Sequence, residues 1–194
     1  MNLLNFFKFL RDKEGKKMPG KIRLLEPDYV FDVNDFIDSK GNMNLNNTPV
    51  TSLPDNLIVR GHLNLKNTPI TSLPDNLEVW ENLFLEKSLV KSLPKGLIVD
   101  GSIYANNTPI TSLPNNLKVG MHVSLNNTRI TSLPDNMSVG GNLSMMASDL
   151  ESIPDDLKVE GWMAIAYTPA AFKYDSYSED ELKQMFPSIS IIYR

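Results

Sequence analysis

Polar and apolar residues alternate in short stretches of this chain, and the alternation is clearest around residue 60. Apolar or small side chains occupy every second position there: Leu57, Val59, Gly61, Leu63 and Leu65. Polar side chains lie between or after them: Arg60, His62, Asn64 and Lys66. A period of two is typical of a strand with one buried face. The pattern therefore predicts a short strand that turns its odd-numbered side chains inward.

The whole pattern returns every twenty residues, without insertion, from Gly41 through Glu160. Six copies begin at residues 41, 61, 81, 101, 121 and 141, and a degenerate seventh begins at Gly161. One column is apolar in every copy and is always followed by proline: Leu53, Leu73, Leu93, Leu113, Leu133 and Ile153. A fixed period of this length indicates a stacked repeat architecture, because so short a unit cannot bury a core alone.

The positions of proline place the strand within each copy. Prolines of the repeat fall only in the "NTPI" and "SLP" segments, and none enters the "HLNL" segment. Proline lacks the N–H group that a central strand needs, so the hydrogen-bonded ladder belongs to "HLNL". The "DNL" and "NTP" segments carry residues typical of turns. We expect each copy to add one short strand to a parallel sheet, with strands about 4.8 Å apart.

The segment "LNLKNTPITSLP", residues 63–74, resembles the leucine-rich repeat pattern L-x-L-x-x-N-x-L-x-x-L-P. Five residues fall on its marks: Leu63, Leu65, Ile70, Leu73 and Pro74. The twenty-residue length is similar to the short repeats of bacterial secreted effectors, and T-S-L-P repeats resemble those of bacterial and phage proteins. The resemblance implies a β-rich solenoid, a leucine-rich repeat stack with one parallel sheet.

Two features of the repeat depart from the family. The first leucine of the usual pattern is missing, so local curvature is expected to differ from the usual horseshoe; its place is taken by Arg60, Trp80, Asp100, Gly120, Gly140 and Glu160. A hydroxyl column replaces the usual asparagine ladder: Thr48, Thr68, Ser88, Thr108, Thr128 and Ser148. These hydroxyls are expected to bond to the backbone of the turns. Some of the similar effectors also carry a ubiquitin-ligase domain with a catalytic cysteine. This chain contains no cysteine, so it cannot share that activity.

The two ends of the chain are expected to cap the stack. We divide the chain into an N-terminal helix and capping segment (1–40), the six copies (41–160), and a degenerate seventh repeat with a short α/β cap (161–194). Residues 2–13 place apolar side chains at helical spacing: Leu3, Leu4, Phe6, Phe7 and Leu10. The first interpretation is a capping helix, which repeat proteins require. The basic residues of this region leave a membrane-surface or partner-docking helix, or a disordered tail, as alternatives.

The last thirty or so residues carry clear signals for two elements. Ser178 followed three residues later by Glu181 forms a capping-box signature, which predicts a short helix that Pro187 ends. The sequence "SISIIYR" then predicts a final strand. The acidic residues of this region are expected to form a solvated face rather than a metal site: Asp175, Glu179, Asp180 and Glu181.

Composition excludes several classes of function. The net charge is −4, so binding of nucleic acid through a broadly basic surface is not expected. The absence of cysteine suits a reducing cytosol, so we expect a cytoplasmic protein, of the producing cell or of a host cell. No apolar stretch reaches the ~20 residues that span a bilayer, and Asn5 and Lys8 interrupt the apolar start. Membrane contact is therefore expected, if anywhere, only through the N-terminal helix.

The side chains that point outward from the sheet are the candidates for function, because the fold does not dictate them. Phe84 and Tyr104 share a column in adjacent copies and should lie side by side on the solvent face. Exposed aromatic anchors within a polar rim are typical of binding hot spots. The candidate partner-binding set is Trp80, Phe84, Tyr104, His62, Asn64, Lys66, Glu86, Asn106 and His122. The competing interpretation is that Phe84 and Tyr104 pair with each other only to stabilise the sheet.

Enzymatic functions find little support in the sequence. His62 and His122 share a column but lie three copies apart, about 14 Å at the spacing of sheet strands, too far for one metal or one proton relay. No phosphate-binding loop, nucleophile elbow or dinucleotide fingerprint is present. We expect no catalytic residue, no metal site and no cofactor.

The sequence thus predicts a non-catalytic module that binds another protein through the exposed face of its sheet, as an effector or an inhibitor. A rigid sheet loses little entropy on binding, so a few aromatic anchors can supply the affinity. The alternative is a binder of a repetitive glycan or another polymer, such as an ice lattice, through columns of threonine and asparagine.

Overall fold

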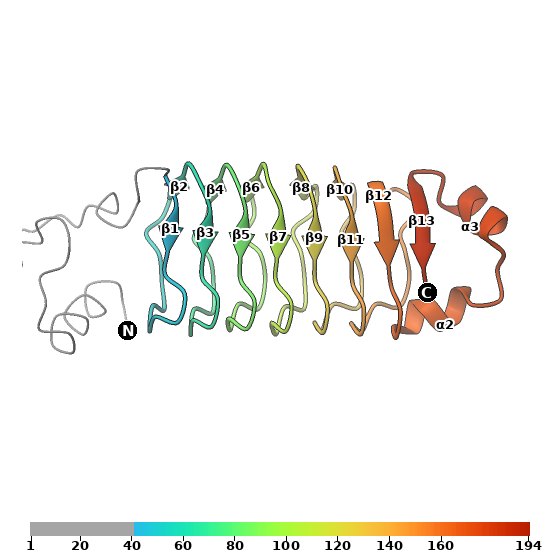
Figure 1. Ribbon diagram of the computed structural model, residues 1–194, viewed down its shortest axis with the longest axis horizontal. Helices are drawn as coiled ribbons and strands as arrows, with labels where there is room; N and C mark the ends of the chain where they lie inside the picture. The colour runs from blue at the N-terminus through green and yellow to red at the C-terminus, as the bar shows by residue number, and fades with distance from the viewer. Residues whose placement is uncertain (1–40) are drawn as a thin grey trace, which may run out of the picture.

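The protein is a β-solenoid, in which the chain winds into a rod of stacked coils (Figure 1). The computed structural model describes residues 41–194, so the expected N-terminal helix and cap lie outside the described residues. Within the described part, all strands join one parallel sheet of 13 strands, and two helices lie near the C-terminus. The prediction of a solenoid with one parallel sheet is confirmed.

The sheet contains two rows of short strands that run the length of the rod. The first row contains β1 (Met43–Asn44), β3 (Leu63–Asn64), β5 (Leu83–Phe84), β7 (Ile103–Tyr104), β9 (Val123–Ser124) and β11 (Leu143–Ser144). The second row contains β2 (Ile58–Val59), β4 (Glu78–Val79), β6 (Ile98–Val99), β8 (Lys118–Val119) and β10 (Ser138–Val139). Both rows end on β12 (Lys158–Ala164), and β13 (Ile189–Tyr193) pairs with β12. The register is one repeat throughout, so Leu63 lies opposite Leu83.

The prediction of one strand per coil is wrong, because each coil contributes two. The chain bends between the two strands, at residues 60–61 and their equivalents. Just after the bend, the N–H group of His62 donates to Asn42 Oδ1 at 2.8 Å, and the N–H of Ser102 donates to Asn82 Oδ1 at 2.8 Å. A side chain of the preceding coil therefore replaces a backbone carbonyl at this column. The backbone ladder is interrupted there, which separates the two rows of strands.

The core is a stack of identical apolar columns. In the second coil, Leu63, Leu65, Ile70 and Leu77 are all 0 % exposed. Each fully buried side chain of this size contributes roughly 1.5–3 kcal/mol relative to an exposed one. Because an equivalent side chain lies above and below each of them, the core continues through every described coil and the coils stabilise one another.

The hydroxyl column bonds to the turns, as the sequence predicted. Thr68 Oγ1 donates to the carbonyl of Leu65 at 2.7 Å, and the same bond is made in the other coils by Thr48, Thr108, Thr128, Ser148 and Thr168. Ser88 is the exception among these hydroxyls, because its buried Oγ has no hydrogen-bond partner within residues 41–194. Its backbone N–H still donates to the carbonyl of Leu85, at 2.9 Å. The turn is therefore kept even where the side chain does not support it.

Two columns of residues adopt the left-handed backbone conformation that the turns require. Asparagine occupies most of these positions, as at Asn67 (φ 54°) and Asn76 (φ 55°). Glycine adopts this conformation without strain, and asparagine tolerates it better than most other residues. Lys87 (φ 59°) and Ala147 (φ 54°) stand in the same column as Asn67 and carry more backbone strain.

We expect Lys87→Asn and Ala147→Asn to stabilise the protein, each by about 0.5–1 kcal/mol, because asparagine relieves the strain of the left-handed conformation. Denaturant unfolding of the two variants measures the free energy directly. Lys91→Asn, at an exposed position of the same coil as Lys87, is the matched control and should leave stability within about 0.5 kcal/mol of the parent. Equal stability of all three variants would contradict the inference that Lys87 and Ala147 carry backbone strain.

The C-terminal cap contains two helices before the last strand. Helix α3 (Glu179–Met185) begins with the predicted capping box, in which Ser178 and Glu181 exchange hydrogen bonds. The backbone and side-chain bonds from Ser178 hold the pKa of the Glu181 carboxyl below its usual range. This carboxylate therefore stays charged to lower pH than an ordinary glutamate, and the capping box persists with it. Helix α2 (Pro169–Tyr174) was not predicted, although Thr168 as N-cap and Pro169 at the first position are its sequence signals.

Candidate protein-binding face

Phe84 and Tyr104 lie side by side on the outer face of the sheet, as the repeat register predicted. They are directly paired in the parallel strands β5 and β7. Their ring centroids are 5.2 Å apart and the ring planes are inclined by 8°, so the rings stack on each other. Such a pair contributes about 0.5–1.5 kcal/mol beyond the area it buries.

Phe84 contacts side chains of the preceding coil as well as Tyr104 of the next coil. Lys66 Nζ lies 4.5 Å from the centre of the Phe84 ring, and the rings of His62 and Phe84 meet edge to face with centroids 5.8 Å apart. Lys66 also forms an ion pair with Glu86, at 2.8 Å. Tyr104 differs from Phe84, because the next side chain in its column is the small Ser124. Tyr104 thus ends the stack with one ring face toward a short side chain.

Trp80 lies at the bend between β4 and β5 and is 45 % exposed. The guanidinium carbon of Arg60 lies 5.6 Å from the centre of the Trp80 ring, and the indole N–H donates to Glu78. Two isoleucines on the neighbouring strands are exposed by 50 % each, Ile58 in β2 and Ile98 in β6. We call Ile58, Trp80, Phe84, Ile98 and Tyr104 the central patch.

Ile58 and Ile98 were missed by the sequence analysis. Their column holds Glu78, Lys118, Ser138 and Lys158 in the other coils, so two isoleucines stand out in a polar column. The signal was present, but the column was not assigned to the sheet because only one strand per coil was expected. The second row of strands brings this column onto the outer face.

Acidic groups outnumber basic groups around the central patch. Four carboxylates surround it, from Glu78, Glu81, Glu86 and Asp100, against the three cations of Arg60, Lys66 and Lys118. Glu81 Oε2 lies 2.9 Å from His62 Nε2. One oxygen of Glu86, Oε2, is buried and has no hydrogen-bond partner among the described residues. The rim of the patch is therefore of mixed charge, with an excess of one negative charge.

Asn106 and Asn64 both accept hydrogen bonds, but only those of Asn106 join neighbouring coils. Asn106 Oδ1 accepts from the Ser124 hydroxyl at 2.7 Å and from the N–H of Asn126 at 2.9 Å. Asn64 Oδ1 accepts from the N–H of Lys66 in its own coil, at 3.2 Å. These two amides flank the central patch, but their acceptor oxygens already serve the fold.

His62 and His122 are rungs of a side-chain ladder that runs the length of the described coils. His62 Nδ1 accepts from the N–H of Asn82 at 3.1 Å, and His122 Nδ1 accepts from the N–H of Asn142 at 2.9 Å. Asn42, Asn82, Ser102 and Asn142 fill the same role in the other coils. His62 also touches Phe84, whereas His122 stands one coil beyond Tyr104, next to Ser102 in the ladder.

A second group of exposed apolar side chains lies at the C-terminal end of the sheet, and the sequence analysis missed it. The rings of Trp162 and Tyr193 meet edge to face with centroids 5.9 Å apart. Trp162 is 37 % exposed and Tyr193 53 %. Because the repeat degenerates after Gly161, the repeat register does not reach β13, and only the structure brings these two rings together.

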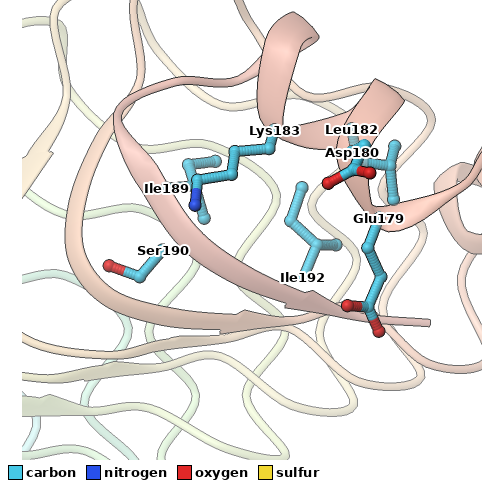
Figure 2. A pocket seen from close by; sticks show the side chains of 7 residues that line it. All are labelled: Glu179, Asp180, Leu182, Lys183, Ile189, Ser190 and Ile192. Carbon is cyan, nitrogen blue, oxygen red and sulfur yellow. The ribbon is translucent and has the colours of Figure 1, made fainter.

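The structure also contains a cavity of about 250 Å³ between α3 and β13. Figure 2 shows Glu179 and Asp180 on its helix side, with Lys183 reaching toward β13 and Ile192 between them. Within residues 41–194, no group of three or more histidine, aspartate or glutamate side chains could hold a metal ion. The cavity offers mixed charge over isoleucine side chains, and the hydroxyl of Ser190 in its lining donates to the carbonyl of Glu160 at 3.1 Å.

Comparison with known proteins gives no family for this chain. No protein-family model matches the sequence, and no curated protein matches it. Neither α2 nor α3, the helices of the described part, has the length and apolar character needed to cross a membrane. Inferences about function therefore rest on the repeat pattern and on the geometry of the outer face.

Proposed function

We propose that this protein is a leucine-rich repeat protein of the short bacterial and phage type, and that it binds a partner protein without catalysis. The partner contacts the outer face of the sheet at the central patch. The resemblance of the repeats to those of secreted effectors favours an effector or inhibitor role in the cytoplasm, of the producing cell or of a host.

The observation that carries this proposal is the concentration of exposed apolar side chains in three successive coils. Ile58, Trp80 and Ile98 are about half exposed, and the Phe84–Tyr104 stack lies below them on the same sheet. Elsewhere along the same columns of the repeats, the side chains are mostly polar or small. Aromatic groups inside a charged rim have the composition of a binding hot spot.

The geometry gives less support to a glycan or an ice lattice as the ligand. The buried hydroxyls of Thr68, Thr108 and Thr128 are bonded to turn carbonyls, so this column faces the core rather than solvent. Phe84 is stacked between Lys66 and Tyr104 along the rod, so its ring faces are not open to a sugar. Asn67 donates to Asn47, and Asn76 donates to Asn56, so these amides bond along their own columns.

The test is capture of a partner by the immobilised protein from the lysate of its native host, compared with the Phe84→Ala/Tyr104→Ala variant. The variant should lose the captured protein, because it removes two anchors at the centre of the contact. A binding curve with the purified partner should then show the same loss. Capture unchanged by the substitutions would contradict the proposal.

The matched control is Asn44→Ala/Ser144→Ala, which changes two outward side chains of the same column, each two coils away from the stack. This control should capture the partner normally. Thermal unfolding of both variants separates binding from folding: the control should unfold close to the parent temperature. Phe84→Ala/Tyr104→Ala, which loses the stack, should unfold several degrees lower but stay folded at the temperature of the capture experiment. An unfolded Phe84→Ala/Tyr104→Ala protein would instead favour a purely stabilising role for the stack.

A further inference from the structure

We propose that the C-terminal end of the sheet is a second binding site, which takes an extended peptide segment of a partner protein. The segment adds a strand to the outer edge of β13 and places one aliphatic side chain in the cavity between β13 and α3. A basic side chain beside it faces Glu179 and Asp180. This site is separate from the central patch, so the inference goes beyond the proposed function.

The strand β13 lies at the end of the sheet. Within residues 41–194, β12 is the only strand that pairs with it. The N–H group of Ile165, just after β12, donates to the carbonyl of Tyr193 at 2.8 Å. Backbone groups of successive strand residues point to opposite edges, so the N–H and C=O groups of Ile192 point away from β12. An added strand can bond to these groups.

The sequence of β13 does not protect this edge. Natural edge strands are usually kept from pairing with other chains by charged side chains or proline. The strand Ile189–Tyr193, "ISIIY", contains neither. Helix α3 covers the start of the strand, where Ile189 is 3 % exposed and belongs to the same core cluster as Leu182. Further along, Ile192 is only partly buried.

An apolar column of the core ends at Ile192. The last members of this column are Leu143, Met163 and Ile192, which are paired in register. Leu143 and Met163 are 0 % exposed. Ile192 has Met163 on one side and lines the cavity on the other. A strand added to β13 would continue the column with its own inward side chain, and an aliphatic group there would complete the burial of Ile192.

The size of the cavity fits a side chain better than a cofactor. Its volume is about 250 Å³, and its lining comes only from α3 and β13. Pockets for drug-sized ligands are larger, roughly 300–1,000 Å³. The cavity is therefore suited to one or two aliphatic side chains of a segment whose backbone lies along the strand.

The charges of the lining favour a basic residue in the segment. Figure 2 shows Glu179 and Asp180 on the side of Ile192, whereas Lys183 reaches toward Ile189. The open half of β13 therefore has two carboxylates beside it. Two charges close to the lining are already held by the fold. The Glu181 carboxylate belongs to the capping box, and the Arg194 guanidinium donates to two backbone carbonyls at the end of α2 and just after it.

The shape of this end favours a single extended segment over a second copy of the chain. Helices α2 and α3 project beyond β13 along the rod (Figure 1). The end of another rod therefore cannot approach the edge of β13 without displacing them. A lone extended segment is narrow enough to lie along β13 with α3 as its second wall, which is the usual form of strand addition.

The probe is a library of random short peptides displayed on phage and selected on the immobilised full chain. Peptides are kept if they also bind Phe84→Ala/Tyr104→Ala, so the central patch is not their site. We expect the selected peptides to alternate aliphatic and polar residues and to carry lysine or arginine. Fluorescence anisotropy of the labelled synthetic peptides gives the dissociation constants. A selection that yields no such peptide overturns the proposal.

An N-methyl scan of the tightest peptide tests strand addition directly. In an added strand, only every second N–H group faces β13. Methylation of these groups should weaken binding about tenfold each, and methylation of the others should change it by less than about twofold. A scan without this alternation means that the peptide binds by its side chains alone, which overturns the proposal.

The variant Glu179→Gln/Asp180→Asn locates the peptide. It should weaken binding of the basic peptide about threefold or more, and it should not affect the same peptide with glutamine in place of the basic residue. The matched control is Asp135→Asn/Glu151→Gln, which neutralises two exposed carboxylates outside the cavity. Thermal unfolding of both variants shows that each is folded. Equal binding of the basic peptide by parent, variant and control overturns the site.

Sedimentation of the full chain tests the other occupant. A dimer that the peptide dissociates would make a second copy of β13 the natural occupant and would overturn the proposal. The outcome is independent of partner capture at the central patch. If the peptides bind and no partner is captured, this site stands and the proposed function fails. If capture succeeds and the N-methyl scan shows no alternation, the proposed function stands and this site fails.

Discussion

The Leu125→Ala variant is expected to lose about 2–5 kcal/mol of folding free energy, the usual range for truncating a fully buried leucine. Leu125 is 0 % exposed and lies in the middle of the continuous core. The loss should be near the upper end, because the next side chain in this column toward the N-terminus is already the small Ala105. Two adjacent small residues leave a larger cavity, which neighbouring coils cannot close without shifting the register.

Denaturant unfolding followed by circular dichroism gives this free energy. The matched control is Leu89→Ala, because Leu89 is 50 % exposed. Its truncation should change stability by no more than about 0.5 kcal/mol. If the two variants were equally stable, the leucine column would not be the source of the cohesion between coils.

The repeat period explains why so much of the fold could be predicted from the sequence. Twenty residues per copy, with no insertion from Gly41 through Glu160, leaves only one register in which all apolar columns coincide. A slip of one residue would turn every buried side chain outward. The same register placed Phe84 beside Tyr104, and the structure confirms that pairing.

The arrangement of the chain within each coil was harder to predict. Alternation continues from residue 57 to residue 66, so the pattern cannot show that the strand is interrupted at the bend. The interruption depends on the side-chain acceptors at Asn42, His62 and their equivalents, which take N–H groups from the next coil. Hydrogen bonds between side chain and backbone depend on the side-chain rotamers, and a column of polar residues in the sequence does not specify those rotamers.

The extent of the candidate binding face was underestimated for the same reason. When one strand per coil was expected, Trp80 lay outside the strand that carries Phe84, and Ile58 and Ile98 were not assigned to the sheet. With two, Ile58, Trp80 and Ile98 follow one another in adjacent coils. Conversely, Asn106 and His122 lose part of their functional interest, because each already holds the next coil in place.

A different kind of evidence is needed to separate structural from functional polar residues on this face. The ladder that contains His62 and His122 also includes three asparagines and a serine. These residues share only a side-chain acceptor that reaches a backbone N–H of the next coil. Glycine often occupies the position just before a ladder residue, where it lies against the ladder side chain of the preceding coil. A Cβ at Gly141 would lie 2.5 Å from His122 Nδ1, and one at Gly61 would lie 2.3 Å from Asn42 Oδ1. Glycine therefore makes room for the acceptor.

We expect His122→Leu to destabilise the protein by about 1–2 kcal/mol, because it leaves the N–H group of Asn142 without its acceptor in a partly buried site. His122→Asn should restore most of this loss. Asparagine holds the same position in the ladder at Asn82, where its Oδ1 accepts from Ser102 at 2.8 Å. The measurement is denaturant unfolding of the two variants beside the parent.

Partner capture by the same two variants extends the test from folding to function. If His122 acts only as a rung, His122→Asn should bind the partner as the parent does, because the coils keep their register and the central patch is unchanged. Loss of capture in a stable His122→Asn protein would instead show that the imidazole itself contacts the partner. His62 lies against Phe84 and Glu81, so its substitution would change the patch and the ladder together. His122 is therefore the position at which the two roles can be separated.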